Sequence, residues 1–287
     1  MKHCVIPTVW LPLLLFVSCS FRMSREEAIE YFGPGVEPRF EHYAVDGLEM
    51  HYVETGLREE GAPLIVFVHG SPGSWSAFRD YLKDSELRSA ARLVAVDRPG
   101  FGQSNPGQPE PSLKRQAELL SPVLRIPNAR CILVGHSLGG PVIVRMAMDY
   151  PEQVQGLVIV AGSVDPDQER LEWYHKLADY RVVRWILPRD WDVSNQEILP
   201  LAGELQEMLP LWTQVRAPTL LVHGDEDGLV PYANVAFAVA QLTNASARVV
   251  RVEQGDHFIL WSREELVRDA ALALLRGESP DGRLSAR

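Results

Sequence analysis

Seven short apolar runs, each about the length of a β-strand, constrain the fold of this chain more than any other feature. They occupy residues 48–56, 63–70, 91–97, 129–136, 154–162, 218–224 and 247–253. Most of them are near-continuous in Val, Ile and Leu instead of alternating with polar residues. A strand of this kind is buried on both faces, which is typical of a parallel sheet covered by helices.

Segments long enough to form helices separate these runs, for example residues 77–90, 139–150, 231–242 and 263–276. Because strands and helices alternate, the sequence predicts an α/β fold with a mostly parallel central sheet flanked by helices. The chain has 287 residues, of which 46% are hydrophobic, and this is ample for the core of one large domain.

Two segments depart from the alternation. Residues 163–212 contain no strand pattern and hold four of the seven Trp, which are Trp173, Trp185, Trp191 and Trp212. We expect a helical cap there, inserted between a first part of the core at residues 40–162 and a second part at residues 213–276. Residues 277–287 have almost no apolar side chains and predict a disordered tail.

The first 22 residues differ in character from the rest. A basic start is followed by an apolar stretch that two prolines interrupt, which predicts a signal peptide or lipoprotein leader. The stretch FVSC at residues 16–19 is similar to a bacterial lipobox, in which Cys19 would carry lipid and attach the protein to a membrane. We therefore expect the protein to be located in the bacterial cell envelope. The alternative is a cytoplasmic protein with a buried N-terminal helix.

Charge and cysteine content exclude several classes of function. The formal net charge is -10 with no basic cluster, so a nucleic-acid partner is not expected. Cys131 lies within an apolar run, and the other two cysteines lie in the predicted leader, so the body has no predicted disulfide. The eight His do not stand at zinc-ligand spacing from Cys or acidic residues, and we predict no metal site.

The sequence GHSLGG at residues 135–140 places a polar Ser137 at the end of a predicted buried strand. Gly135 and Gly139 lack the Cβ atoms that would clash in a sharp turn from strand to helix. The pattern G-x-S-x-G in this context is a nucleophile elbow, which exposes a serine hydroxyl beyond the strand. The backbone N–H of Leu138 at the start of the next helix is a predicted oxyanion donor.

The sequence HGSPGS at residues 69–74 follows another predicted strand. A second oxyanion donor is needed, and the backbone N–H of Ser71 is the candidate. We expect the His69 side chain to be structural and to hydrogen-bond loop carbonyls. Trp75 comes directly after this loop and is a candidate for substrate binding.

Two acidic and histidine-containing loops follow the last two predicted strands. A serine hydroxyl needs a neutral imidazole to take its proton, and the imidazole needs a carboxylate to fix its tautomer. His257 is the candidate base and Asp227 the candidate acid, which gives the chain order Ser, Asp, His. We expect Asp225, two residues earlier in the same loop, to cap that loop.

Together these motifs resemble the α/β-hydrolase fold family, in particular its esterase-like members with a small helical cap. The resemblance runs from about residue 40 to residue 276, and it also includes VDRPGFGQS at residues 96–104, for which we expect a structural turn and no chemistry. It implies Asp227 as the acid, although some relatives keep theirs where Asp165 stands. It also implies that haloalkane dehalogenase and epoxide hydrolase activity are absent, because those relatives use Asp where this chain has Ser137.

The predicted activity is hydrolysis of a small-molecule carboxylic ester through an acyl-enzyme, with no cofactor. Lactones, thioesters and N-terminal prolyl amides are alternative substrates. A hydrolase fold used only as an envelope binding module is a further alternative, for which a broken triad would be the sign. Trp173 and Trp185 in the predicted cap either line the substrate pocket or pack the cap onto the core. The oligomeric state is not predicted.

Overall fold

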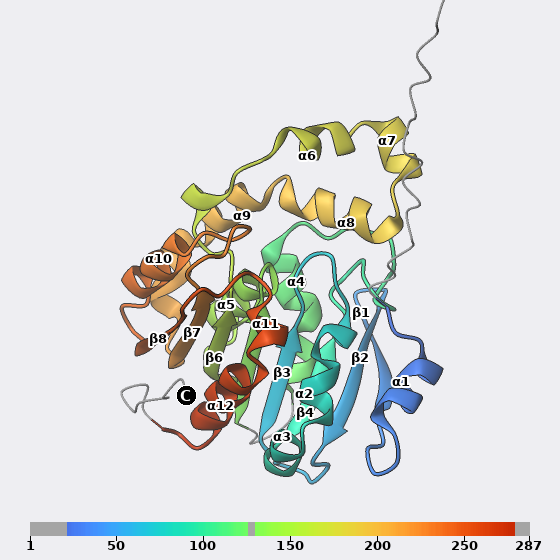
Figure 1. Ribbon diagram of the computed structural model, residues 1–287, viewed down its shortest axis with the longest axis vertical. Coiled ribbons are helices and arrows are strands. Elements are labelled where there is room, and N and C mark those ends of the chain that lie inside the picture. Colours follow the sequence, from blue (N-terminus) through green and yellow to red (C-terminus); the bar gives the residue numbers. More distant parts are fainter. Residues whose placement is uncertain (1–21, 126–129, 279–287) are drawn as a thin grey trace, which may run out of the picture.

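A computed structural model describes residues 22–125 and 130–278. An eight-stranded sheet runs through it in the order β1-β2-β4-β3-β5-β6-β7-β8 (Figure 1). The strands are β1 (Arg39–Val45), β2 (Leu48–Gly56), β3 (Leu64–Val68), β4 (Arg92–Val96), β5 (Cys131–His136), β6 (Val154–Val160), β7 (Thr219–Gly224) and β8 (Ala247–Val252). From β4 to β8 all neighbours are parallel, whereas β2 pairs antiparallel with both β1 and β4. The predicted α/β class with a mostly parallel sheet is confirmed.

All seven apolar runs form strands, and their continuous apolar character has the expected cause. Every residue of β3, β5 and β7 is buried. The sequence did not reveal β1, because this edge strand has no buried residue and alternates charged and aromatic side chains. It pairs with β2 from Arg39 opposite Glu54 to Val45 opposite Leu48.

Buried apolar side chains in the described chain form one cluster on each face of the sheet. β3 divides its side chains between them: Leu64, Val66 and Val68 join one cluster, and Ile65 and Phe67 join the other. The first face is covered by α4 (Leu113–Leu120), α5 (Gly139–Asp149) and α10 (Ala233–Gln241). The second is covered by α1 (Arg25–Phe32), α2 (Arg79–Lys83), α3 (Ser85–Ala90), α11 (Ile259–Ser262) and α12 (Glu264–Leu275).

Residues 163–212, here called the cap, are helical and lie beyond one end of the strands (Figure 1). Their helices are α6 (Trp173–Ala178), α7 (Arg181–Ile186), α8 (Arg189–Ile198) and α9 (Leu201–Met208). Short 3₁₀ turns at Pro166–Gln168 and Leu209–Gln214 join them to the core. Helices α8 and α9 bury residues against the core, whereas α6 and α7 bury none.

The predicted leader and tail fall almost entirely outside the described residues, so Cys19 and the proposed lipid attachment stay predictions. The described chain begins at Arg22, which pairs with Asp190 of the cap at 2.9 Å. Between residues 22–125 and 130–278, no helix combines the length and the hydropathy that a membrane span needs.

Candidate active site

Ser137 stands in the tight turn between β5 and α5. Its φ is +54°, which is unfavourable for a residue with a Cβ and is typical of a nucleophile elbow. The two flanking glycines are required sterically. A Cβ on Gly135 would come within 2.4 Å of the Gly139 carbonyl oxygen, and one on Gly139 within 2.2 Å of the Val68 carbonyl oxygen. The turn therefore holds the serine at the carboxyl end of the central strand.

Asp227 and His257 come from the loops after β7 and β8 and form a buried pair. His257 Nδ1 donates to Asp227 Oδ2 at 2.8 Å, which leaves its Nε2 for a proton acceptor role. The other carboxylate oxygen accepts the backbone N–H groups of Leu229 and Val230. Burial alone would raise the pKa of Asp227, but the hydrogen bonds from His223 and His257 outweigh it and hold that pKa below its ordinary value. The acid is thus ionised and fixes the imidazole tautomer.

The two alternative acids have other partners. Asp165 Oδ1 accepts the backbone N–H of Asp167 and caps the 3₁₀ turn at Pro166–Gln168. Asp225 pairs with Arg251 at 2.8 Å and accepts the backbone N–H of Gln254. Of the three candidate acids, the structure brings Asp227 to the His257 ring.

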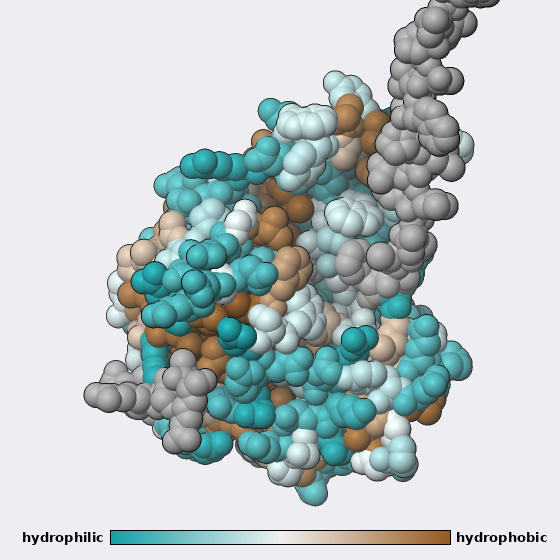
Figure 2. Space-filling view, viewed as in Figure 1, coloured by the Kyte–Doolittle hydropathy of each residue, from teal (hydrophilic) through white to brown (hydrophobic). Residues whose placement is uncertain are grey.

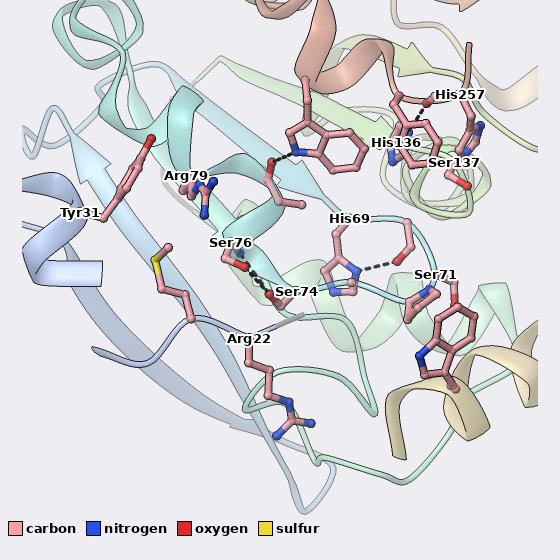
Figure 3. A pocket seen from close by; sticks show the side chains of 18 of the residues that line it. Arg22, Tyr31, His69, Ser71, Ser74, Ser76, Arg79, His136, Ser137 and His257 are labelled. Atoms are coloured by element: carbon pink, nitrogen blue, oxygen red, sulfur yellow. Dashed lines mark hydrogen bonds between the residues drawn. The ribbon is translucent and has the colours of Figure 1, made fainter. Parts of the chain in front are cut away.

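A pocket of about 980 Å³ opens beside these residues. Ser137 and His257 line it, and the loop at residues 69–74 forms another wall (Figure 3). Four apolar side chains also line it, and these are Trp191, Leu229, Phe258 and Trp261. Further lining residues come from the segment 22–31 and from residues 76–79, and they include charged side chains. Figure 2 shows the hollow between the cap and the core, with pale and brown side chains around it. The pocket is large enough for a substrate of drug size.

The loop at residues 69–74 carries the predicted oxyanion donor. His69 is fully buried; its Nδ1 donates to the Gly70 carbonyl at 2.7 Å, and its Nε2 accepts the backbone N–H of Arg98 at 3.0 Å. This is the structural role that the sequence predicted. In the described part of the chain, the backbone N–H groups of Ser71 and Leu138 donate to no other backbone group. Ser71 lines the pocket, and Leu138 follows Ser137 directly in the chain.

Comparison with known proteins decides the family. A model of the alpha/beta hydrolase family matches residues 65–270. The chain belongs to the alpha/beta hydrolase family. The resemblance drawn from the sequence motifs is confirmed.

Alpha/beta hydrolases of varied activity are similar to this one. "Serine hydrolase BPHL" of Mus musculus is 26% identical over 257 residues, which covers 80% of this chain and 84% of that protein. "Epoxide hydrolase 4" of Mus musculus is 33% identical over 117 residues, which covers 40% of this chain and 32% of that protein. The match thus spans about a third of the epoxide hydrolase. The solved structure "Crystal structure of a membrane phospholipase A, a novel bacterial virulence factor" has a TM-score of 0.67 at 24% identity, covering 88% of this chain and 89% of that one, and it shows the shared fold.

A buried ion pair joins the cap of this alpha/beta hydrolase to the loop at residues 69–74. Arg98 and Glu197 are almost fully buried and form two hydrogen bonds, of 2.8 and 3.0 Å. Arg98 also donates to the carbonyls of His69 and Gly70 at 2.8 and 2.9 Å, and Glu197 accepts the Ser71 hydroxyl at 2.9 Å. The sequence interpretation treated residues 96–104 as a structural turn and missed this pair.

The three Trp residues proposed for substrate binding do not line the pocket. Trp75 is 2% exposed and packs between Phe32 and Phe40, because the turn that follows the loop directs its indole into the core. Its assignment to substrate binding is corrected on this ground. Trp173 and Trp185 project into solvent from α6 and α7. Among the described residues, the indoles that line the pocket are those of Trp191 on α8 and Trp261 on α11.

His136 contacts the candidate base, His257. Its buried Nε2 donates to the His257 carbonyl at 3.1 Å, and its ring lies against those of His257 and Trp261. Burial, with a smaller effect of the neighbouring His257, lowers the pKa of His136 to about 3. The same cause lowers the pKa of His69. Both rings are therefore neutral in the folded protein.

We expect the protein to lose stability in mild acid because of these two rings. The unfolded chain binds protons at His69 and His136 below their ordinary pKa of 6.5, whereas the folded chain does not, so stability is complete above 6.5 and falls as the pH is lowered toward 3. Each ring should account for about 2 kcal/mol between about pH 7.5 and about pH 5. Urea denaturation at both pH values measures the loss.

A variant of one of these rings tests the cause. His136→Asn should reduce the pH-dependent loss by about 2 kcal/mol. Equal losses in the wild type and in His136→Asn would contradict the assignment of a neutral, buried His136.

Within residues 22–125 and 130–278, no group of three or more His, Cys, Asp or Glu side chains is placed to hold a metal ion. Cys131, buried in β5, is a free thiol.

Proposed function

We propose that this protein is a serine hydrolase that cleaves a carboxylic ester through an acyl-enzyme intermediate. One observation carries the proposal: Ser137 in its strained turn and the His257–Asp227 pair come from three separate loops and meet at one pocket. Groups so far apart in sequence converge in this way when they act together on a substrate.

The proposed reaction begins when His257 Nε2 takes the proton of Ser137 as its oxygen attacks the ester carbonyl carbon. Asp227 stabilises the imidazolium that forms. The backbone N–H groups of Ser71 and Leu138 stabilise the oxyanion, and each such donor is worth roughly 3 kcal/mol. The imidazolium then protonates the leaving alcohol, and a water activated by the same ring releases the acid product.

The identity of the nucleophile favours an ester over an epoxide, although some relatives are named epoxide hydrolases. Attack of Ser137 on an epoxide would form an ether, which water does not cleave under these conditions. Attack on an ester forms an acyl-serine, which the same base and oxyanion donors can hydrolyse. Turnover is therefore possible only for an acyl substrate, and lactones and thioesters satisfy this requirement as well.

A fluorophosphonate probe tests the proposal, because it reacts only with a serine that a neighbouring base activates. We expect rapid labelling of the wild type at Ser137, confirmed by peptide mapping, and none of Ser137→Ala. Asp227→Asn should slow labelling by about a hundredfold or more, since an amide cannot hold the required tautomer.

The alternative acids supply matched controls. Asp165→Asn and Asp225→Asn should label at nearly the wild-type rate, because their side chains bond elsewhere. If the wild type does not react while its fold is intact, the protein is a binding module and the proposal fails. If Asp165→Asn slowed labelling more than Asp227→Asn, Asp165 at the end of β6 would be the acid.

A further inference from the structure

The cap carries an apolar surface that residues 22–125 and the rest of 130–278 do not cover. Helices α6 and α7 bury none of their residues, although they are rich in aromatic and aliphatic side chains. Trp185 is 86% exposed, Val182 74% and Trp173 71%. Together with Tyr180 and Ile186, these residues are here called the cap apolar surface. Helices α6 and α7 lie at the top of the molecule in Figure 1, and pale and brown side chains are visible in the same region of Figure 2. Exposed apolar side chains gathered on two helices that contact each other are typical of an interaction site.

Basic side chains lie on and beside the helices that carry the cap apolar surface. Residues 170–191 contain five Lys or Arg, of which Arg184 and Arg189 pair with Asp192 and Asp190. Arg170, Lys176 and Arg181 are exposed, and none forms an ion pair within the part of the chain that the structure describes. The surface thus combines aromatic rings with basic side chains, which complements an anionic partner.

This combination fits a lipid surface. Trp and Tyr are favoured at the boundary between headgroups and acyl chains, where the ring has one apolar side and one wet side. Lys and Arg beside them attract anionic headgroups, and their long apolar stems extend along the same boundary. Short helices with such faces bind in the plane of the interface without spanning it.

One side chain of the cap also lines the pocket. Helix α8 follows α7 directly, and its Trp191 lines the pocket while half of it remains exposed. Leu229 and Phe258 line the same opening and are also more than half exposed. An acyl chain leaving a bilayer under the cap would therefore meet apolar side chains along its path to Ser137.

We propose that the cap apolar surface docks this protein on an anionic lipid bilayer and directs its pocket to an ester of a lipid in that bilayer. The docking requires only the surface described above. The choice of a lipid ester rests in addition on the proposed serine hydrolase function.

Sedimentation of the full chain with vesicles tests the docking. The vesicles contain equal parts of phosphatidylcholine and phosphatidylglycerol, or phosphatidylcholine alone. The double variant Trp185→Ser/Ile186→Ser should bind the anionic vesicles at least about tenfold more weakly than the wild type. The double variant Lys176→Glu/Arg181→Glu should lose binding to anionic vesicles only, and added salt should abolish the difference from the wild type.

Matched controls come from exposed apolar residues far from the cap in sequence. Ile29→Ser/Val239→Ser removes two side chains that are 52% and 44% exposed, and it should bind like the wild type. All variants keep residues 1–22, so a difference between them reports the cap. Equal sedimentation of the wild type and both cap variants would overturn the proposal. So would cap variants that change the elution of the protein without lipid from dimer to monomer and leave vesicle binding intact.

The docking and the hydrolysis can fail separately. The vesicle assay is repeated with Ser137→Ala, which should sediment like the wild type. If the protein binds the vesicles and hydrolyses a soluble ester but no ester of the vesicle lipids, the proposed lipid substrate is wrong. If neither ester is hydrolysed, the proposed function fails and the docking surface stands.

Discussion

Replacing Ser137 or His257 by Ala should reduce kcat for short p-nitrophenyl esters by about four to six orders of magnitude. The nucleophile and its base act as one unit, so the loss of either removes nearly the whole covalent route. The remaining rate above that of water would come from the oxyanion donors and from substrate binding. Steady-state kinetics on both variants and on the double variant measure the effect, and the double variant should be no slower than either single one.

A fold control is available at the same position. Ser137 has a φ of +54°, which Gly tolerates better than Ser or Ala. Ser137→Gly should therefore be about 1 kcal/mol more stable than Ser137→Ala while both are inactive. If Ser137→Ala kept more than about a tenth of the wild-type rate, Ser137 would not be the nucleophile.

The sequence predicted the elements of this fold and of this site that have a local signal. Buried strands appear as runs of Val, Ile and Leu, and the elbow appears as glycines spaced around Ser137, because a Cβ there would contact the backbone at 2.4 Å or less. Asp227 and His257 follow two predicted strands in the chain order Ser, Asp, His. Their residue types and their positions after the carboxyl ends of those strands were enough to propose them.

Other features have no local signal. The edge strand β1 is half-exposed, so its residues do not form an apolar run. The direction of a Trp side chain depends on the turn that carries it, which is why Trp75 is in the core and Trp261 lines the pocket. Arg98 and Glu197 are charged residues separated by 99 positions. Their burial follows from the packing of the cap on the core, which the sequence does not show.

The buried pair of Arg98 and Glu197 gives the second prediction. Glu197→Ala should lower the free energy of unfolding by about 3 to 5 kcal/mol, because it leaves the guanidinium buried and without its partner. It should also lower kcat by about tenfold to a hundredfold, since Glu197 accepts the Ser71 hydroxyl and Arg98 holds the two preceding carbonyls. Urea denaturation and steady-state kinetics measure the two effects.

A double variant separates stability from positioning. Arg98→Met/Glu197→Met replaces the pair by apolar side chains of similar length, so much of the lost stability should return. The carbonyls of His69 and Gly70 would still lack their donor, and the loop that presents the Ser71 N–H would still be less fixed. We therefore expect kcat to stay low with KM little changed, since the loop N–H acts mainly on the charge that develops in the transition state. Recovery of both stability and kcat would mean that the pair only fills the space beneath the cap.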